Sequence, residues 1–241
     1  VVATVGTTST TSIDPVRQIA DICRREGLWL HVDAAYAGVT AIIPEYRARF
    51  DGWEEADSVV VNPHKWLFTP FDLSAFYCRR MDVVRQAFSL VPDYLATAEG
   101  ARGVRNLMDT GIQLGRRFRS LKLWMVLRHF GAEGIRSAIA EHIRLAQIFS
   151  GWVDGDPNFE RLAPVPFSVV CFRARPRTLR MSDAELDALN ERLLDAVNAT
   201  GEVFLSHTRL NGLFVLRLAI GHLRTTEQHV ARAWELLRLH L

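Results

Sequence analysis

Two residues of opposite charge follow predicted β-strands in this sequence and could do chemistry together. Asp33 comes directly after an apolar run at 28–32, and Lys65 lies shortly after a second apolar run at 58–61. In an open parallel α/β sheet, ligands bind beyond the carboxyl ends of the strands. The 32 residues from Asp33 to Lys65 amount to one more strand–helix step, so we expect both side chains at the same edge of the sheet.

An amine and a carboxylate at one sheet edge have a shared role in the chemistry of pyridoxal 5′-phosphate (PLP). The lysine forms a Schiff base with the cofactor's aldehyde, and the aspartate keeps the pyridine nitrogen protonated so that the ring can accept electrons. Each residue alone has an ordinary explanation, because Asp often caps helices and Lys is mostly solvated. His64 by itself is typical of a loop histidine. The pairing of Asp33 with Lys65 therefore suggests a PLP site and leaves the ordinary explanations open.

The elements that must position these residues follow a strand–helix–strand pattern. An apolar run at 1–5 predicts a strand, and a Gly/Thr/Ser turn follows at 6–12. Asp14 and Pro15 are typical of a helix start, and Gly27 is typical of its end. Further strands are predicted at 28–32, 58–61 and 73–78. This order predicts a mostly parallel sheet.

The second half of the sequence is richer in helix. Helical spacing of apolar residues covers 116–130 and 133–153, and a capping box formed by Ser182 and Glu185 opens another helix. Strands are predicted at 169–172, 203–205 and 213–220, a closing helix at 225–239, and a loop at 90–111. We predict an α/β fold in which residues 1–120 form the C-terminal portion of a PLP-binding large domain. Residues 121–241 would form a small α+β domain.

Several segments, in matching order and spacing, resemble one enzyme family over nearly the whole chain. Asn-Pro-His-Lys-Trp at 62–66 looks like the PLP-lysine motif of the group II amino-acid decarboxylases, which include aromatic-L-amino-acid, histidine and glutamate decarboxylases. The segment 31–38 resembles the family's aspartate motif, and 6–8 its threonine turn. The segments 114–122 and 231–235 are similar to the aromatic branch. The resemblance implies the PLP-dependent transferase fold type I. It also implies a homodimer that decarboxylates an L-amino acid, expected to be aromatic, to the amine and carbon dioxide.

The resemblance also implies roles for individual residues. Lys65 would carry the cofactor, and Asp33 would partner its ring nitrogen. A tyrosine in a catalytic loop at 92–95 would protonate the substrate Cα after carbon dioxide leaves. The catalytic residues implied are Lys65, Tyr94 and His64, and the cofactor-binding residues are Lys65, Asp33, Asn62, Thr8, Ala35 and His64.

Other functions stay open at this point. An aldehyde synthase or an aminotransferase of the same cofactor fold would carry the same lysine, and Tyr94 favours plain decarboxylation because related aldehyde synthases tend to have Phe there. The chain could also be an inactive fragment that serves only as a dimerisation module. A nucleotide-binding α/β domain is a weaker alternative, since the sequence has no GxGxxG or Walker motif. The segment 106–113 looks more like bacterial members than animal ones, which leaves the substrate open.

Composition limits the remaining classes. The net charge of +2, with basic residues scattered, argues against nucleic acid or a membrane as partner. Three cysteines far apart form no metal-binding spacing, which favours a reduced, cytoplasmic protein without a metal. The chain begins with a β-prone run and no initiator Met, so we expect a fragment whose N-terminal part is absent.

Overall fold

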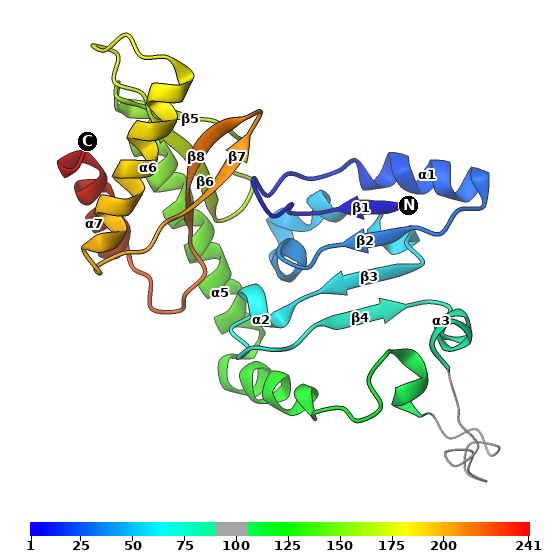
Figure 1. The fold of residues 1–241 in the computed structure, drawn as a ribbon. Helices are drawn as coiled ribbons and strands as arrows, with labels where there is room; N and C mark the ends of the chain where they lie inside the picture. The colour runs from blue at the N-terminus through cyan, green and yellow to red at the C-terminus, as the bar shows by residue number, and fades with distance from the viewer. Residues whose placement is uncertain (90–105) are drawn as a thin grey trace.

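A computed structural model of the chain describes residues 1–89 and 106–241, and it contains two β-sheets joined by a long helix (Figure 1). The first part comprises β1 (Val2–Thr4), α1 (Val16–Glu26), β2 (His31–Asp33), β3 (Ser58–Val61), α2 (Pro63–Trp66), β4 (Ala75–Cys78) and α3 (Met81–Phe88). The second comprises α5 (Arg119–Gly155), β5 (Phe159–Arg161), β6 (Val169–Ala174), α6 (Asp183–Ala199), β7 (Ser206–Leu210), β8 (Leu213–Ala219) and α7 (Glu227–Leu239). Short 3₁₀ helices lie at Ala37–Ile42, Pro44–Phe50, Trp53–Glu55 and Leu107–Thr110.

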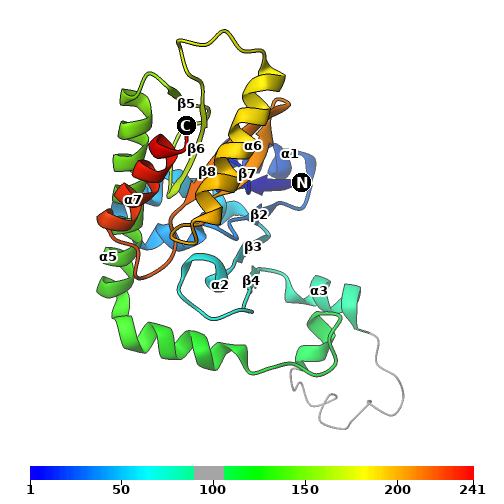
Figure 2. The ribbon, with the colours of Figure 1, turned by 60° about the vertical axis from the view of Figure 1, so that its left-hand side comes forward.

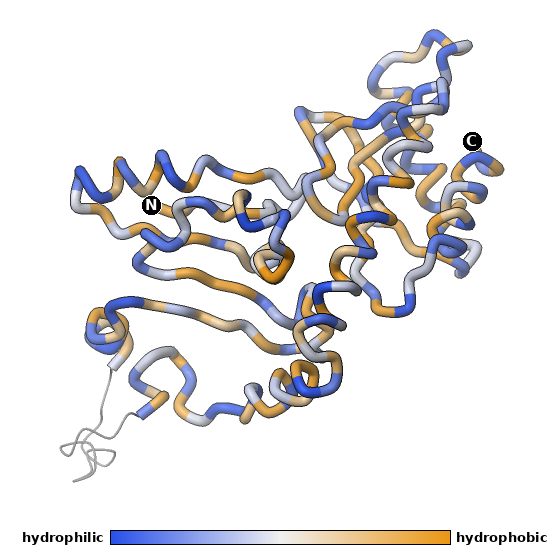
Figure 3. The backbone as a smooth tube through the Cα atoms, turned by 180° about the vertical axis from the view of Figure 1, so that it is seen from behind, coloured by the Kyte–Doolittle hydropathy of each residue, from blue (hydrophilic) through white to orange (hydrophobic). Residues whose placement is uncertain are grey.

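The first sheet has the strand order β1-β2-β3-β4. The first three strands are parallel, with Ala3 opposite Val32 and Val32 opposite Val59, and β4 is antiparallel to β3. The central strand β3 is a short run of valines after Ser58, as expected for a strand inside a parallel sheet, whereas β2 has Val32 buried between His31 and Asp33. Figure 3 shows a contrast with α1, since the strands are largely hydrophobic whereas α1 alternates between hydrophilic and hydrophobic segments. The predicted α/β fold with a mostly parallel sheet is confirmed.

Helix α1 connects the first two strands and differs at one end from the prediction. Gly27 ends the helix in the left-handed conformation (φ 64°), as its position predicted. Asp14 does not cap the helix: Pro15 occupies the N-cap position, and a carboxylate oxygen of Asp14 accepts a hydrogen bond from the Thr4 backbone N–H (2.7 Å). The aspartate therefore fastens the end of β1 instead of the start of α1.

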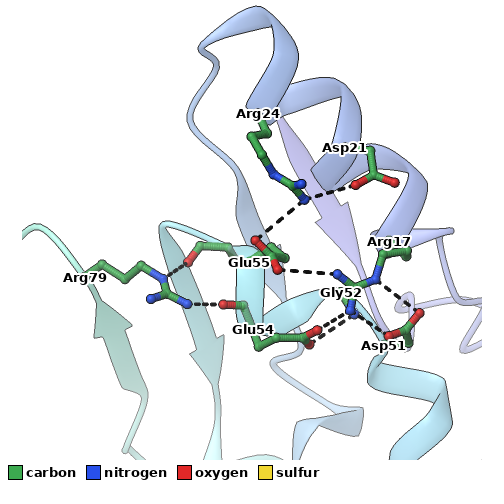
Figure 4. A network of polar contacts seen from close by, with 9 residues as sticks. Arg17, Asp21, Arg24, Asp51, Gly52, Glu54, Glu55 and Arg79 are labelled. Atoms are coloured by element: carbon green, nitrogen blue, oxygen red, sulfur yellow. Dashed lines mark hydrogen bonds and ion pairs between the residues drawn. The ribbon is translucent and has the colours of Figure 1, made fainter.

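The segment before β3 is held against α1 by polar contacts and by one close backbone approach (Figure 4). Arg17 on α1 pairs with Asp51 (2.8 Å) and also with Glu54 and Glu55. A Cβ atom on Gly52 would lie 2.5 Å from the Cα of Arg17, and the φ of Gly52 is +93°. Exposed ion pairs contribute little individually, so the glycine contact is the more demanding constraint here.

The long helix α5 is interrupted at Gly131, whose φ of 64° and ψ of 176° are not helical. This break agrees with the two separate helical patterns in the sequence. Figure 2 shows that the two parts of α5 run in different directions, with the second part rising along the C-terminal sheet. Ile135, Ile139 and Ile143 of this second part are buried in the core of the first sheet, and Leu145 and Phe149 lie in the core of the second.

The second sheet is antiparallel throughout, with the order β5-β6-β8-β7. Side chains of β6 alternate: Val170 and Phe172 face the core formed with α5, α6 and α7, whereas Val169 and Cys171 face the opposite side, near Tyr36. Both faces of β6 are therefore covered, which explains why all its residues are buried. This antiparallel sheet with its helices agrees with the small α+β unit predicted for the C-terminal part.

Two details of this region differ from the sequence prediction. The strand predicted at 203–205 is wrong, because the Asn198 side chain binds both the N–H and the carbonyl of Leu205 (2.8 and 2.9 Å), and β7 begins at the next residue. The short strand β5 carried no clear pattern. The capping box of Ser182 and Glu185 is confirmed.

The domain boundary at residue 120 stays a prediction. None of the helices in the described ranges is long and apolar enough to cross a membrane.

Candidate active site

The carboxyl ends of the first three strands meet at a small cavity. The threonine turn follows β1, Asp33 ends β2, and α2 with Lys65 follows β3. The cavity has a volume of about 190 Å³. Its lining consists of Thr4, Gly6, Thr7, Thr8, Thr11, Asp33, Ala35, Tyr36, Lys65, Val169, Arg217 and Ala219. The structure thus brings together four of the predicted site residues, namely Asp33, Lys65, Thr8 and Ala35.

Asp33 lines the cavity, and one of its carboxylate oxygens binds the backbone. Its Oδ1 accepts a hydrogen bond from the Ala35 N–H (2.9 Å), which fixes the side chain at the end of β2. Within the described residues, Oδ2 accepts no hydrogen bond from the protein. Asp33 can therefore bind a protonated nitrogen of a ligand with this second oxygen.

Lys65 lies on α2, a helix of only four residues. Pro63 occupies its first turn, where a missing backbone N–H costs nothing. The Lys65 side chain is exposed, and the sequence contains one other lysine, Lys122. An accessible amine at the cavity wall, on an element that follows a buried strand, matches the placement predicted for the cofactor lysine.

Asn62 and His64 flank Lys65 but do not line this cavity. The Leu73 backbone N–H donates to His64 Nδ1 (2.8 Å), so the neutral imidazole carries its proton on Nε2. The His64 ring also packs on Phe71, with 5.0 Å between ring centroids. Ser74 donates to the Asn62 side-chain oxygen (2.6 Å). Residues of the segment after α2 therefore fix the side chains of both Asn62 and His64.

Arg217, on β8, is a cavity residue that the sequence reasoning missed. Its guanidinium donates to the carbonyl oxygens of Thr8 (2.7 Å) and Ser9 (2.9 Å) and to the Ser206 hydroxyl (3.1 Å). These bonds fasten the threonine turn to the C-terminal sheet. The signal in the sequence was an arginine inside an otherwise apolar strand, where a charge is expected to have a partner.

Tyr36 lines the cavity, and Cys171 bonds the adjoining threonine turn; both are neutral groups. The Tyr36 hydroxyl and the Ser168 hydroxyl are hydrogen-bonded (2.6 Å), and burial raises the pKa of Tyr36 to about 12. The Cys171 thiol donates to the Ser9 carbonyl (3.2 Å), and burial raises the pKa of this thiol as well. Neither group is ionised near neutral pH, so Lys65, Asp33 and Arg217 supply the charges of the cavity.

The cavity fits an aldehyde-bearing pyridine cofactor in its donor set. An amine, a carboxylate oxygen and several hydroxyl groups converge there. In addition, Thr11 is 1% exposed and its Oγ1 has no hydrogen-bond partner among the described residues. A buried hydroxyl without a partner is costly unless a ligand or water satisfies it. The polar groups of the cavity therefore suit a cofactor that carries an aldehyde and a ring nitrogen. The predicted catalytic residue Tyr94 lies outside the described residues.

Comparison with known proteins agrees with this arrangement. The family model for the pyridoxal-dependent decarboxylase conserved domain matches residues 1–175. The chain belongs to the pyridoxal-dependent decarboxylase family. The predicted resemblance is confirmed, and so are the predicted cofactor class and the fold of this family.

Individual members of the family are similar along almost the whole chain. Phenylacetaldehyde synthase of Arabidopsis thaliana is 47% identical over 98% of this chain and 48% of the relative. Tryptophan decarboxylase 2 of Oryza sativa subsp. japonica is 47% identical over 98% of this chain and 47% of the relative. The crystal structure of Oryza sativa TDC with PLP and tryptamine has a TM-score of 0.93 and 40% identity, covering 99% of this chain and 49% of that one. The chain spans about half the length of the relatives it matches.

Proposed function

We propose that the protein containing this chain is a PLP-dependent carboxy-lyase that converts an L-amino acid to its amine and carbon dioxide. The observation that carries the proposal is the convergence of Lys65 and Asp33 on one cavity at the carboxyl ends of parallel strands. That position is where α/β sheets bind ligands. PLP, when bound, supplies the electron sink that stabilises negative charge at the substrate Cα.

The residues of the chain divide the remaining work. Lys65 would hold the cofactor through Nζ, which requires an accessible amine at the cavity wall. Asp33 would keep a proton on the ring nitrogen through Oδ2. Thr8 and Ala35, which line the cavity, would contact the cofactor. Asn62 and the His64 Nε2–H would be available as polar groups for its phosphate. Tyr94 is proposed to return a proton to Cα.

We infer an aromatic substrate from the relatives. Proteins 43–47% identical to this chain are tryptophan and tyrosine decarboxylases of plants. Their shared substrate class is an amino acid with a planar side chain. A solved structure of the family also carries tryptamine together with PLP.

Aldehyde synthesis is a second candidate because a phenylacetaldehyde synthase is also 47% identical to this chain. The two reactions differ in products, since the synthase would give aldehyde and peroxide in place of the amine. Tyr94 supports decarboxylation over aldehyde synthesis.

One experiment tests both candidates. The protein is incubated with PLP and a panel of aromatic L-amino acids, and amine, carbon dioxide, aldehyde and hydrogen peroxide are measured. Lys65→Ala is expected to abolish turnover and the visible absorbance band of the bound cofactor, whereas Lys122→Ala retains both. A Lys65→Ala protein with an unchanged band would refute the assignment of the lysine.

We also propose that the active protein is a homodimer. Large apolar side chains are exposed on a contiguous part of the sequence around the start of α5, including Ile112 (92% exposed), Phe118 (75%) and Trp124 (58%). Exposed apolar clusters of this kind are typical of protein–protein interfaces. Light scattering is expected to give twice the mass of one chain, and a monomer at micromolar concentration would contradict the proposal.

The proposed location is the cytoplasm. Cys23, Cys78 and Cys171 are free thiols, and Cys23 and Cys171 are buried. Free, widely spaced thiols are typical of proteins in reducing compartments. Localisation of a tagged full-length protein by cell fractionation tests this.

A further inference from the structure

The helix that carries Lys65 depends on a neighbour for its stability. With four residues, α2 is too short to be stable by its own hydrogen bonds. Its anchor is Trp66, the residue next to Lys65, which is completely buried. Whatever fixes the Trp66 ring therefore also fixes the direction in which Lys65 leaves the backbone.

Trp66 contacts two other aromatic rings. Tyr36 stacks on it, with 4.8 Å between centroids and an interplanar angle of 7°. The ring of His142 is nearly parallel to the indole (12°) at a centroid distance of 6.4 Å, and it lies at the edge that carries the indole N–H. A Cβ atom on Gly221 would also come within 3.6 Å of the Trp66 ring. Stacking of this kind limits tilting of the indole but permits it to slide or rotate within its plane.

The hydrogen bond from Trp66 to His142 removes that remaining freedom. The Trp66 Nε1–H donates to His142 Nδ1 (3.0 Å), and His142 is only 2% exposed. Burial lowers the pKa of His142, which favours the neutral imidazole that accepts this hydrogen bond. His142 lies in the second part of α5, after the break at Gly131, where the helix is held by the cores of both sheets.

The hydrogen-bonded pair of Trp66 and His142 differs from its apolar surroundings in the core. Aliphatic residues of α5 on either side of His142, such as Ile139 and Ile143, fill the core without polar groups. An apolar residue in place of His142 would leave the buried indole N–H without an acceptor. Hydrogen-bonded pairs inside a core specify one orientation of the rings, whereas apolar packing alone allows several.

We infer that His142 is a positioning residue for the cofactor lysine, acting through the indole of Trp66. This inference rests on the proposed function of Lys65. His142 is not one of the residues that line the cavity, and it lies 76 residues from Trp66 in the sequence. The orientation of the reactive amine is thus set by the long helix that packs on the C-terminal sheet.

The presence of only two lysines permits a direct test that does not depend on turnover. Cofactor-free protein is mixed with PLP, reduced with borohydride at timed intervals, and digested, and the fraction of Lys65 and Lys122 that carries the cofactor is measured by mass spectrometry. Lys122 is the internal control for general reactivity. Each variant is assayed well below its own unfolding midpoint, which is measured separately.

The variants separate the hydrogen bond from simple packing. His142→Phe keeps a ring and removes the acceptor, Trp66→Phe removes the donor, and His142→Asn places an amide oxygen near the position of Nδ1. His129→Phe, at an exposed histidine on the same helix, is the matched control. We expect labelling of Lys65 to slow about tenfold in His142→Phe and in Trp66→Phe, equivalent to about 1.4 kcal/mol. The double variant should slow no further, and His142→Asn should recover most of the rate.

The outcomes are distinct. A wild-type rate at Lys65 in His142→Phe, or equal slowing at Lys65 and Lys122, would overturn the inference even if the unfolding temperature falls. If His142→Phe does not fold, Trp66→Phe and His142→Asn decide the question by the same comparison. A wild-type protein that labels Lys65 no faster than Lys122 would instead contradict the proposed function.

Discussion

Replacing Arg217 should loosen the threonine turn and weaken the cavity at the same time. In Arg217→Met the aliphatic part of the side chain is retained and the guanidinium is lost. The Thr8 carbonyl and the Ser206 hydroxyl then lose the guanidinium donor, and the Ser9 carbonyl keeps only the Cys171 thiol. The turn would be free to move away from Asp33.

The magnitude follows from the contacts. A hydrogen bond from a charged donor contributes about 1.5–3 kcal/mol. The bond to Thr8 is exposed, so water compensates for part of its loss in the variant. The bonds to Ser9 and Ser206 are partly buried and are compensated less. We therefore expect a loss of about 3 kcal/mol in the free energy of unfolding. For a chain of this length that lowers the unfolding midpoint by about 6–12 °C.

The assay combines thermal unfolding without cofactor and titration with PLP, followed by the absorbance of the bound cofactor. Arg209→Met is the control, because Arg209 lies on the neighbouring strand β7, is 57% exposed, and pairs with Asp187 and Glu191. Loss of exposed ion pairs costs about 1 kcal/mol or less. Equal stability of the Arg217 and Arg209 variants, with unchanged PLP affinity, would refute the reasoning about the turn.

Three further results are expected. Gly52→Ala should lower the free energy of unfolding by more than about 2 kcal/mol in denaturant titrations, and Gly201→Ala, at a glycine with positive φ but no atom within 4 Å of an added Cβ, by about 1 kcal/mol. Equal effects of the two substitutions would contradict the backbone contact between Gly52 and α1. Because the pKa of Tyr36 is raised to about 12, this tyrosine ionises at lower pH in the unfolded chain than in the folded protein. The free energy of unfolding should therefore fall as the pH rises above about 10, and Tyr36→Phe should flatten this slope between pH 9 and 11. Ser182→Ala removes the cap of α6 and should cost about 1 kcal/mol, measurable as a lower urea midpoint; no change would mean that the capping box contributes nothing.

The part of the site that could be predicted from sequence is the part made of neighbouring strand ends. Asp33 and Lys65 each follow an apolar strand, and parallel strands place such residues on one edge by rule. The break of α5 at Gly131 was visible in the same way, since two helical patterns flank it. Local patterns therefore gave both the sheet edge and the helix boundaries that surround the site.

The rest depends on contacts between distant parts of the chain. Arg217 bonds residues 208 and 209 positions away, and nothing in its neighbourhood indicates that partner. The wrong strand at 203–205 has a similar cause, because Asn198 takes up the backbone groups of Leu205 through a contact that a pattern of apolar residues does not reveal. Asp14 is predicted from the sequence to cap a helix, but in the structure its carboxylate accepts a hydrogen bond from the Thr4 N–H at the end of β1.

The span between the threonine turn and Arg217 also has a consequence for the order of assembly during synthesis. Lys65 and Asp33 leave the ribosome with the first sheet, but the residue that fastens the turn is made about 150 residues later, roughly 8–30 s at ordinary rates of elongation. For that interval the nascent chain carries the reactive amine beside an open turn. The cavity becomes complete only after β8 has paired, so a chain stalled before this strand would expose the amine without the walls that select its ligand.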